Sequence, residues 1–559
     1  MFFVGSNQRG FQDSWILEGI FIPTILYVLT FTIVVVATSD VRILTIISSS
    51  FVIVLNSIPS LKYQLFYGVF DSAGHYGFIN RLLASGQVPQ TGFYVAFYGD
   101  FPGMHILIGS LSLILGVSTN VAIKLFTSLI YGIVPLMVYL VTNRVFDGSI
   151  QRAIIIASGL PAIPTSYVLG GGTFGLALYF IFFCVLFRRG LTDNSRFAYS
   201  VILLVLGFAL LFSHAATMPF LLWILAIVTF YWTIRGIRKE TRVDTYGRGL
   251  APILIILAAS FTALQAFKAI DFLAVFVGGI ERALLRESLR APIPPRLFAL
   301  PLSAQLTFLA LYYVMDLIVF VLGLVGLLIL MRRIRIRNGQ LFEKFYLPVI
   351  LVISALGLIV AFQLASSFGE IGVARALNYS MIFQPFFIGL VLWLLLKSFA
   401  SRTLKSVLPV VFLFLTISIS LIQIFPYQPM VPRANVLSKE LPASDYLADL
   451  REVNTLCNIA AITFAEYHST TGTRIASDIV TRWQIYGFTS EAFNNGHIWY
   501  SPLETTTPNW DIFILHYDGT AGPLKEKVEN RTGQRIMMLK DTLGNVVYDG
   551  GGCFIIEHV

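Results

Sequence analysis

The sequence predicts an α-helical polytopic membrane protein, with about 12 spans, a re-entrant or interfacial helix and a small C-terminal extracytoplasmic α/β domain. Of its 559 residues, 56% are apolar or aromatic and 12% are charged, and the mean hydropathy is +0.77. A typical soluble domain carries about 25% charged residues. The apolar residues also fall in long runs, so a soluble globular protein, a disordered chain and a disulfide-rich secreted module are excluded.

A membrane span needs about 20 predominantly apolar residues. The segments that reach this length or come near it are 16–38, 41–58, 120–143, 152–168, 173–188, 197–213, 216–234, 251–270, 305–331, 345–367, 377–397 and 405–425. A further apolar stretch, 101–116, is shorter than a span. Whether it crosses the bilayer decides the topology.

The loop charges favour a helix at 101–116 that does not cross. Six basic loops hold 19 Lys and Arg against 6 acidic residues, and they are 39–42, 144–152, 188–196, 235–248, 332–344 and 397–405. Cytoplasmic loops carry the excess of Lys and Arg. All six are cytoplasmic together only if 101–116 stays on one side as a re-entrant or interfacial helix. Both termini then lie outside, and the chain is a multi-pass protein of the cell membrane.

The distribution of charge excludes nucleic acid as a partner. The net charge is +9, but residues after 430 carry −5, so the membrane part carries +14. That positive charge sits in short loops, where it sets orientation. Membrane lipids are therefore the expected surroundings of the basic residues.

The chain divides into two predicted domains. Residues 1–429 form the transmembrane domain, with a first outer loop at 59–119 and a basic outer loop at 271–304. Residues 430–559 form an extracytoplasmic α/β domain with strand-like runs at Thr473–Ser477, Trp510–His516, Asn545–Tyr548 and Cys553–Glu557. Cys457 and Cys553 both fall in this domain, and whether they pair is left open.

The first outer loop contains the candidate catalytic residue. Asp71 begins a predicted helix that runs to Ser85 and ends at Gly86, and His75 lies one turn after Asp71 on the same face. A carboxylate held at a membrane surface can act as a base on a hydroxyl. The alternative is that Asp71 is only a helix cap.

Asp100 and three histidines are further candidate site residues. Asp100 is favoured as a helix cap, because Pro102 falls in the expected first turn. His75 and His105 are expected as hydrogen-bonded interface histidines, because no H-x-x-x-H or C-x-x-C spacing indicates a metal site. His214 lies at an outer turn between two spans, as a site residue or a polar turn residue.

Arginines in the outer loops are candidates for binding phosphate. Arg282, Arg286 and Arg290 recur every four residues, so a helix aligns them on one face. Arg375 lies at an outer membrane boundary. The paired N–H donors of an arginine guanidinium match the spacing of phosphate oxygens. Alternatively, Arg282, Arg286 and Arg290 lie on an amphipathic helix that contacts anionic lipid. The alternative for Arg375 is that its side chain extends along the membrane to place its charge at the interface.

The layout resembles the GT-C superfamily of polytopic membrane glycosyltransferases, in a prokaryotic, lipid-phosphate-sugar-dependent form distant from oligosaccharyltransferase catalytic subunits. Four features carry the resemblance: Asp71 early in a large outer loop, the motif Phe101-Pro102-Gly103 opening the next helix, Arg375 before a late span, and an extracytoplasmic C-terminal domain. The chain departs from oligosaccharyltransferases because 164–173 has no acidic residue and the tail lacks Trp-Trp-Asp-Tyr-Gly.

The resemblance implies an inverting, metal-independent glycosyltransferase, a hexosyl- or pentosyltransferase without a cofactor. It would move a sugar from a polyprenyl-phosphate-linked donor to a glycan, lipid or protein hydroxyl on the extracytoplasmic face. Asp71 would be the catalytic base. The expected substrate-binding residues are His75, Asp100, His105, His214, Arg282, Arg286, Arg290 and Arg375. The alternatives are a transporter or flippase and a polymerase for lipid-linked glycans, but no inverted repeat favours transport.

Overall fold

The structure, a computed structural model, describes part of the chain. The described residues are 21–62, 70–89, 98–143, 145–159, 171–189, 196–214, 217–237, 250–267, 321–332, 349, 383–398, 456–472, 474–477, 498–500, 512–516, 544–549 and 553–558. The predicted spans at 345–367 and 405–425 and the outer loop at 271–304 therefore fall almost entirely outside them. So do Arg282, Arg286, Arg290 and Arg375.

Helices make up nearly all of the described residues before 400. They are α1 (Phe21–Ala37), α2 (Val41–Lys62), α3 (Phe70–Ser85), α5 (Gly103–Leu115), α6 (Thr119–Leu129), η1 (Ile130–Gly132), α7 (Ile133–Thr142), α8 (Gly148–Ser158), α9 (Gly171–Arg189), α10 (Arg196–Leu211), α11 (Thr217–Ile237), α13 (Ala251–Phe267) and α19 (Gln384–Ser398). Residues 321–332 are also helical.

These helices coincide with most of the predicted spans. The continuous helix Thr119–Thr142, built from α6, η1 and α7, is the one among the described residues that is long and apolar enough to cross a membrane. The other apolar helices found there have 10–17 residues. Several expose large apolar side chains, including Ile114 (80% exposed), Val205 (62%) and Ile255 (65%). Many exposed large apolar side chains of this kind are expected in a protein that faces lipid.

One predicted span has different bounds. The expected segment 152–168 corresponds to α8, which begins at Gly148 and ends at Ser158, with Gly159 as its C-cap. Asp147, with an extended backbone, is the N-cap of this helix. The Asp147 side chain makes no capping hydrogen bond, and the helix starts four residues before the predicted segment. The helix has 11 residues.

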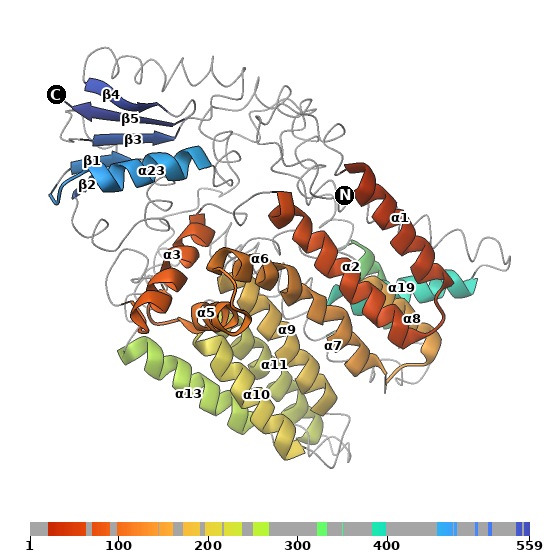
Figure 1. Cartoon of the computed structure of the whole chain (residues 1–559). Coiled ribbons are helices and arrows are strands. Elements are labelled where there is room, and N and C mark those ends of the chain that lie inside the picture. Colours follow the sequence, from red (N-terminus) through yellow and green to blue (C-terminus); the bar gives the residue numbers. More distant parts are fainter. Residues whose placement is uncertain are drawn as a thin grey trace, which may run out of the picture.

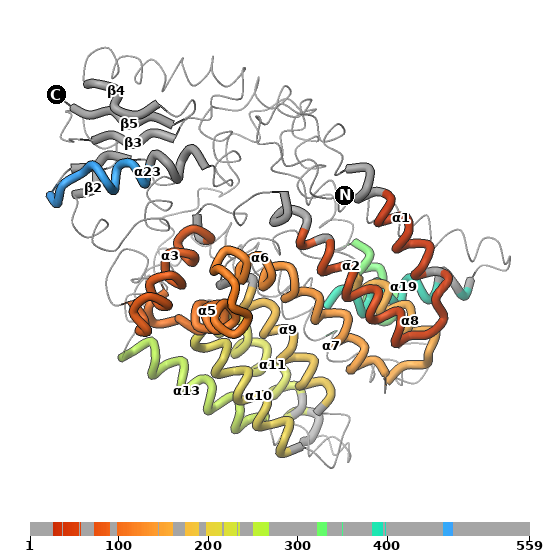
Figure 2. The backbone as a smooth tube through the Cα atoms, in the orientation of Figure 1, coloured from red at the N-terminus to blue at the C-terminus, as the bar shows by residue number. Residues whose placement is uncertain are grey.

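Two groups of helices form the body of the protein (Figure 1). In the first, α2 packs on α6, α7 and α8, and α8 packs on α19. In the second, α9, α10, α11 and α13 lie side by side. The contact between α7 and α9 joins the groups, and Figure 2 follows the backbone through both.

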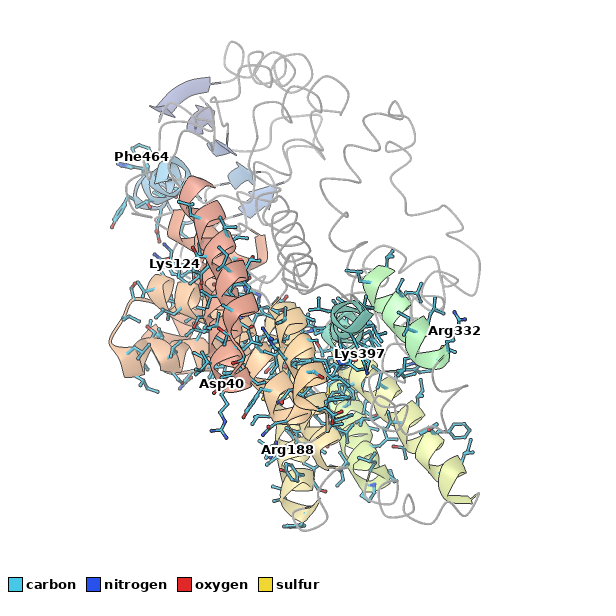
Figure 3. The ribbon with its side chains drawn as sticks, turned by 90° about the vertical axis from the view of Figure 1, so that its right-hand side faces the viewer. Asp40, Lys124, Arg188, Arg332, Lys397 and Phe464 are labelled. Atoms are coloured by element: carbon cyan, nitrogen blue, oxygen red, sulfur yellow. The ribbon has the colours of Figure 1, made fainter. Side chains whose placement is uncertain are left out.

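Several predicted basic loops lie at the same end of this body. The Arg188 guanidinium at the end of α9 donates hydrogen bonds to the Leu140 carbonyl in α7 and the Tyr199 hydroxyl in α10. Arg152, near the start of α8, donates to the carbonyl of Val35 near the end of α1. Asp40, directly before α2, lies toward this end, whereas Lys124 of α6 lies toward the other (Figure 3).

The tail contains a five-stranded mixed sheet. Its strands are β1 (Arg474–Ser477), β2 (Ile498–Tyr500), β3 (Ile512–His516), β4 (Gly544–Asp549) and β5 (Cys553–His558), in the order β2-β1-β3-β5-β4. The first three are parallel and the last two form an antiparallel hairpin. Helix α23 (Leu456–His468) packs on β5 and β3. The four strand-like runs of the sequence are strands, and β2 was not predicted. The domain boundary at 430 stays a prediction, and whether Cys457 pairs with Cys553 stays open.

Candidate functional site

Helix α3 carries the first half of the candidate site. It spans Phe70–Ser85, and Gly86 follows with φ +69°, in the left-handed region that glycine adopts without strain. The predicted end of this helix is therefore confirmed. Asp71 is already helical, so it is not the N-cap residue of α3.

Helix α5 carries the second half. It begins at Gly103 and ends before Gly116, a 13-residue helix of about 20 Å that is too short to cross a bilayer. Figure 1 shows it nearly end-on, across the direction of α9, α10 and α11. Its buried residues include His105, whereas Leu113 and Ile114 are exposed. This arrangement agrees with the predicted re-entrant or interfacial helix.

A close backbone contact holds the start of α5 against the turn between α10 and α11. The Gly103 N–H donates a hydrogen bond of 2.9 Å to the Phe212 carbonyl. A Cβ atom at position 103 would lie 2.6 Å from the Ser213 hydroxyl oxygen and 3.0 Å from the Phe212 carbonyl oxygen. Only glycine allows this approach. The motif Phe101-Pro102-Gly103 therefore fixes where the short helix begins.

The predicted cap at Asp100 is wrong. Pro102 is the residue before the first helical residue, and no side chain caps the helix there. Asp100 lies two positions earlier, in a partly exposed turn closed by a hydrogen bond from the Phe101 N–H to the Tyr98 carbonyl. Pro102 takes the cap position because proline needs no N–H partner at a helix start.

His75 of α3 and His105 of α5 form a direct pair. The Nδ1 atom of His75 lies 2.8 Å from the Nε2 atom of His105, and both side chains are fully buried. The Tyr98 ring packs edge-on against both imidazoles, with centroid distances of 4.7 Å to His75 and 5.9 Å to His105. Phe78 lies 4.1 Å from the His105 ring. The predicted interface histidines are therefore hydrogen-bonded to each other.

His214 joins the site from the turn between α10 and α11. Its Nδ1 atom lies 2.7 Å from the Thr217 hydroxyl oxygen, and its side chain is 9% exposed. Helix α9 comes close to this pair at Gly175, where an added Cβ would lie 2.5 Å from the Thr217 hydroxyl oxygen and 3.1 Å from the His214 Cβ. His214 is also near enough to His75 to lower the pKa of that imidazole electrostatically.

Burial keeps the histidine pair uncharged. Desolvation lowers the pKa of His105 to about 3, although the Pro102 carbonyl partly favours the charged form. The pKa of His75 is lowered well below its ordinary value, first by burial and then by the electrostatic effect of His105 and His214. Burial disfavours the charged imidazolium, so both rings are neutral at pH 7. The pair can donate and accept hydrogen bonds without adding charge.

The structure brings together His75, His105 and His214, all named from the sequence. It places Asp71 one turn before His75 on α3. The side chain of Asp71 is not among those that the structure describes. Tyr98, Thr217 and Gly103 were not chosen as site residues. The only signals for them were their places in Tyr98-Gly99-Asp100-Phe101-Pro102-Gly103 and Ser213-His214-Ala215-Ala216-Thr217.

Within the described residues, no group of three or more His, Cys, Asp or Glu side chains is arranged to hold a metal ion. The arrangement offers neutral hydrogen-bonding groups on α3 and α5, one turn after Asp71. Such a site can orient hydroxyl groups and support a carboxylate that accepts a proton.

Comparisons with known proteins give one structural similarity to describe. No family model matches the chain, and no curated protein matches it. Among solved structures, it is similar to the crystal structure of ArnT from Cupriavidus metallidurans bound to undecaprenyl phosphate. The identity is 10%, the TM-score is 0.49, and the match covers 93% of this chain and 98% of that one. A TM-score below 0.5 does not establish a shared fold, so this similarity carries no part of the functional argument.

Proposed function

We propose that this protein is a membrane glycosyltransferase. It moves a sugar from a polyprenyl-phosphate-linked donor to an acceptor hydroxyl on the extracytoplasmic face. The observation that carries the proposal is the position of Asp71, one turn before a buried and neutral histidine pair. Two helices of the outer loop, α3 and α5, form that pair.

Asp71 is the general base in this mechanism. The acceptor oxygen attacks the anomeric carbon as the bond between that carbon and the phosphate oxygen breaks. The acceptor proton passes to the Asp71 carboxylate, and the leaving group departs as polyprenyl phosphate. A single displacement of this kind inverts the anomeric centre. No step needs a metal ion, because a positioned carboxylate and cationic side chains supply the base and the charge stabilisation.

Arginines supply the charge stabilisation in this proposal. Arg375 binds the phosphate that accumulates charge as the glycosidic bond breaks, with help from Arg282, Arg286 or Arg290. A guanidinium can donate two parallel hydrogen bonds to phosphate oxygens. His214 and Asp100 bind hydroxyl groups of the donor sugar or of the acceptor. The ArnT crystal structure contains undecaprenyl phosphate, which belongs to the same lipid class as the proposed donor. The proposal does not depend on this similarity.

The orientation of the chain belongs to the same proposal. The loops at 39–42, 144–152 and 188–196 are cytoplasmic, and the outer loop at 59–119 lies outside. Hydrogen bonds of Arg188 and Arg152 support this, because they gather residues next to these loops at one end of the body. The C-terminal domain at 430–559 is then extracytoplasmic, on the side of the site, where it can contact an acceptor.

A transfer assay with purified protein in lipid nanodiscs tests the function. Its readout is release of polyprenyl phosphate from polyprenyl-phosphate sugars, measured in the presence of candidate hydroxyl acceptors. Asp71→Asn keeps the size of the side chain but removes the base, and we expect at least a hundredfold loss of kcat. The matched control is Asp40→Asn, because the Asp40 carboxylate only caps the start of α2 by accepting from the Arg42 and Ile43 N–H groups. Full activity of Asp71→Asn would remove Asp71 from the role of base.

A further inference from the structure

Four of the five described strands of the tail sheet end at the same edge. Strand β1 is parallel to both β2 and β3. Strand β5 is antiparallel to both β3 and β4, so β4 runs in the same direction as β3 (Figure 1). The carboxyl ends of β1, β2, β3 and β4 therefore lie along one edge of the sheet, which we call the carboxyl edge.

The strand order has a switch point at this edge, between β1 and β3. In the order β2-β1-β3-β5-β4, the chain that leaves β1 reaches β2 on one side, whereas the chain that leaves β3 reaches β4 on the other side. The two strands are neighbours, with Ser477 opposite Ile514. Open α/β sheets bind ligands outside the carboxyl ends of neighbouring parallel strands whose connections leave in opposite directions. A ligand site is therefore expected at the ends of β1 and β3.

Each of the four strands that reach the carboxyl edge ends in a polar residue. These last residues are Ser477 of β1, Tyr500 of β2, His516 of β3 and Asp549 of β4. The first residues of the same strands are one arginine and three residues without polar side-chain atoms, namely Arg474, Ile498, Ile512 and Gly544. Residues with hydroxyl, imidazole and carboxylate groups are thus concentrated at the edge that carries the switch point.

The register brings three of these strand ends close together. His516 pairs with the first residue of β5 and Asp549 with the second. Adjacent strands are about 4.8 Å apart, which puts the backbones at His516 and Asp549 about 10 Å apart. Ser477 lies opposite Ile514, two residues before His516. With a rise of about 3.3 Å per residue, the backbones at Ser477 and His516 are about 8 Å apart. One short oligosaccharide is long enough to reach all three positions.

The residue types at the four strand ends favour an uncharged ligand. None of the four is lysine or arginine, and the residues after 430 carry a net charge of −5, so a phosphate or another anion is disfavoured. Asp549 and His516 alone are too few to hold a metal ion, which takes four or more ligands in proteins. Sugar hydroxyls suit the set, because they donate to a carboxylate and exchange hydrogen bonds with hydroxyl and imidazole groups.

We propose that the carboxyl edge of the tail sheet binds an uncharged saccharide at the switch point between β1 and β3, and that this saccharide is the acceptor glycan. The inference rests on the proposed function, because it names the acceptor of that reaction. Ser477, His516 and Asp549 bind the part of the glycan that does not react. Contacts of this kind lower KM for the acceptor and leave the proton transfer to Asp71.

The first test measures binding and needs no activity. The full-length protein in nanodiscs is applied, with EDTA present, to an array of neutral di- and trisaccharides of glucose, galactose, mannose and N-acetylglucosamine, together with sulfated and phosphorylated forms. We expect binding to a neutral glycan. His516→Gln and Asp549→Asn should each raise Kd about tenfold, the factor that one hydrogen bond supplies.

The opposite edge of the same sheet offers matched controls. Glu557 and His558 are the last two residues of β5, which ends at that edge because it is antiparallel to β3 and β4. Glu557→Gln and His558→Gln make the same chemical changes there and should leave Kd unchanged. The proposal is overturned if no neutral glycan binds, if only sulfated or phosphorylated glycans bind, or if both pairs of variants weaken binding equally.

The second test measures transfer from polyprenyl-phosphate sugars to the array glycan that binds most tightly. Asp549→Asn should raise KM for this glycan about tenfold and leave kcat at saturating glycan within about twofold of the wild-type value. An unchanged KM overturns the role of the tail in acceptor binding. A wild-type protein that binds the glycan but transfers no sugar contradicts the proposed function and leaves the binding site standing. A protein that transfers sugar to other hydroxyl acceptors but binds no neutral glycan overturns this inference alone.

Discussion

The Thr119 hydroxyl donates a hydrogen bond of 2.7 Å to the side-chain carbonyl of Asn80, which lies 39 residues earlier in the chain. This bond ties the middle of α3 to the first residue of α6. Helix α5 lies between these elements in the sequence and packs on both. The bond therefore closes a small unit of three helices that holds the histidine pair.

Replacing Thr119 with valine should loosen this unit. Valine keeps the shape of the side chain but leaves the Asn80 carbonyl without this donor, so we expect a loss of about 1–2 kcal/mol in the free energy of unfolding. Thermal unfolding in detergent measures it. The control is Thr38→Val, because the exposed Thr38 hydroxyl only bonds back to the Val34 carbonyl of its own helix. Equal stability of the two variants would show that the bond between α3 and α6 contributes nothing measurable.

The close approach at Gly103 predicts that alanine is harmful there. The methyl group would meet the Phe212 carbonyl and the Ser213 hydroxyl, and that hydroxyl is itself held by a hydrogen bond to the Ala209 carbonyl. Overpacking of this kind costs about 1–3 kcal/mol. We expect Gly103→Ala to lower the unfolding temperature and the transfer rate together, because it displaces the start of α5 and with it His105.

Two further variants separate this clash from an effect on helix propensity. Gly148→Ala also adds a methyl group at the first residue of a helix, but a Cβ atom there meets nothing within 4 Å. It should be neutral or slightly stabilising, since alanine favours the helix. Adding Ser213→Gly to Gly103→Ala removes the nearer clash and should recover part of the loss. A Gly103→Ala protein as stable as Gly148→Ala would contradict the tight contact.

Gly175 predicts a similar effect on the other side of the site. A methyl group there would lie 2.5 Å from the Thr217 hydroxyl oxygen and 3.3 Å from the His214 Nδ1 atom. Gly175→Ala should therefore push apart the hydrogen bond between these two side chains and cost about 1–3 kcal/mol. Thermal unfolding measures the stability, and the 15N signal of His214 reports the bond. An unchanged His214 signal would show that α9 yields and that the turn keeps its structure.

Local signals in the sequence predicted much of the fold. The glycine after Ser85 marked the end of α3, and the charge of the loops separated the short helix at 101–116 from the spans. The pairing of His75 with His105 was beyond such reasoning, because it joins positions 30 residues apart. It depends on how α3 crosses α5, which the contact of Gly103 with Phe212 helps to set. Asp100 was misassigned because the prediction placed Pro102 in the first turn, whereas the helix begins at the residue after Pro102.

Acid should destabilise the protein through the buried histidines. The pKa of His105 is about 3 in the folded protein and that of His75 is also lowered, whereas an exposed histidine has a pKa near 6.5. Between these values the unfolded chain binds more protons than the folded one, so stability is present above about pH 6.5 and falls as the pH drops. Each histidine contributes up to about 1.4 kcal/mol per pH unit within that window.

The variant His105→Gln removes one of these groups and should reduce the acid sensitivity. We expect the wild-type protein to lose about 1 kcal/mol more than this variant between pH 7.5 and pH 5.5. Thermal unfolding in the same detergent at both pH values measures the difference. If wild type and His105→Gln lose equal stability on acidification, the imidazole at position 105 is not held neutral by burial.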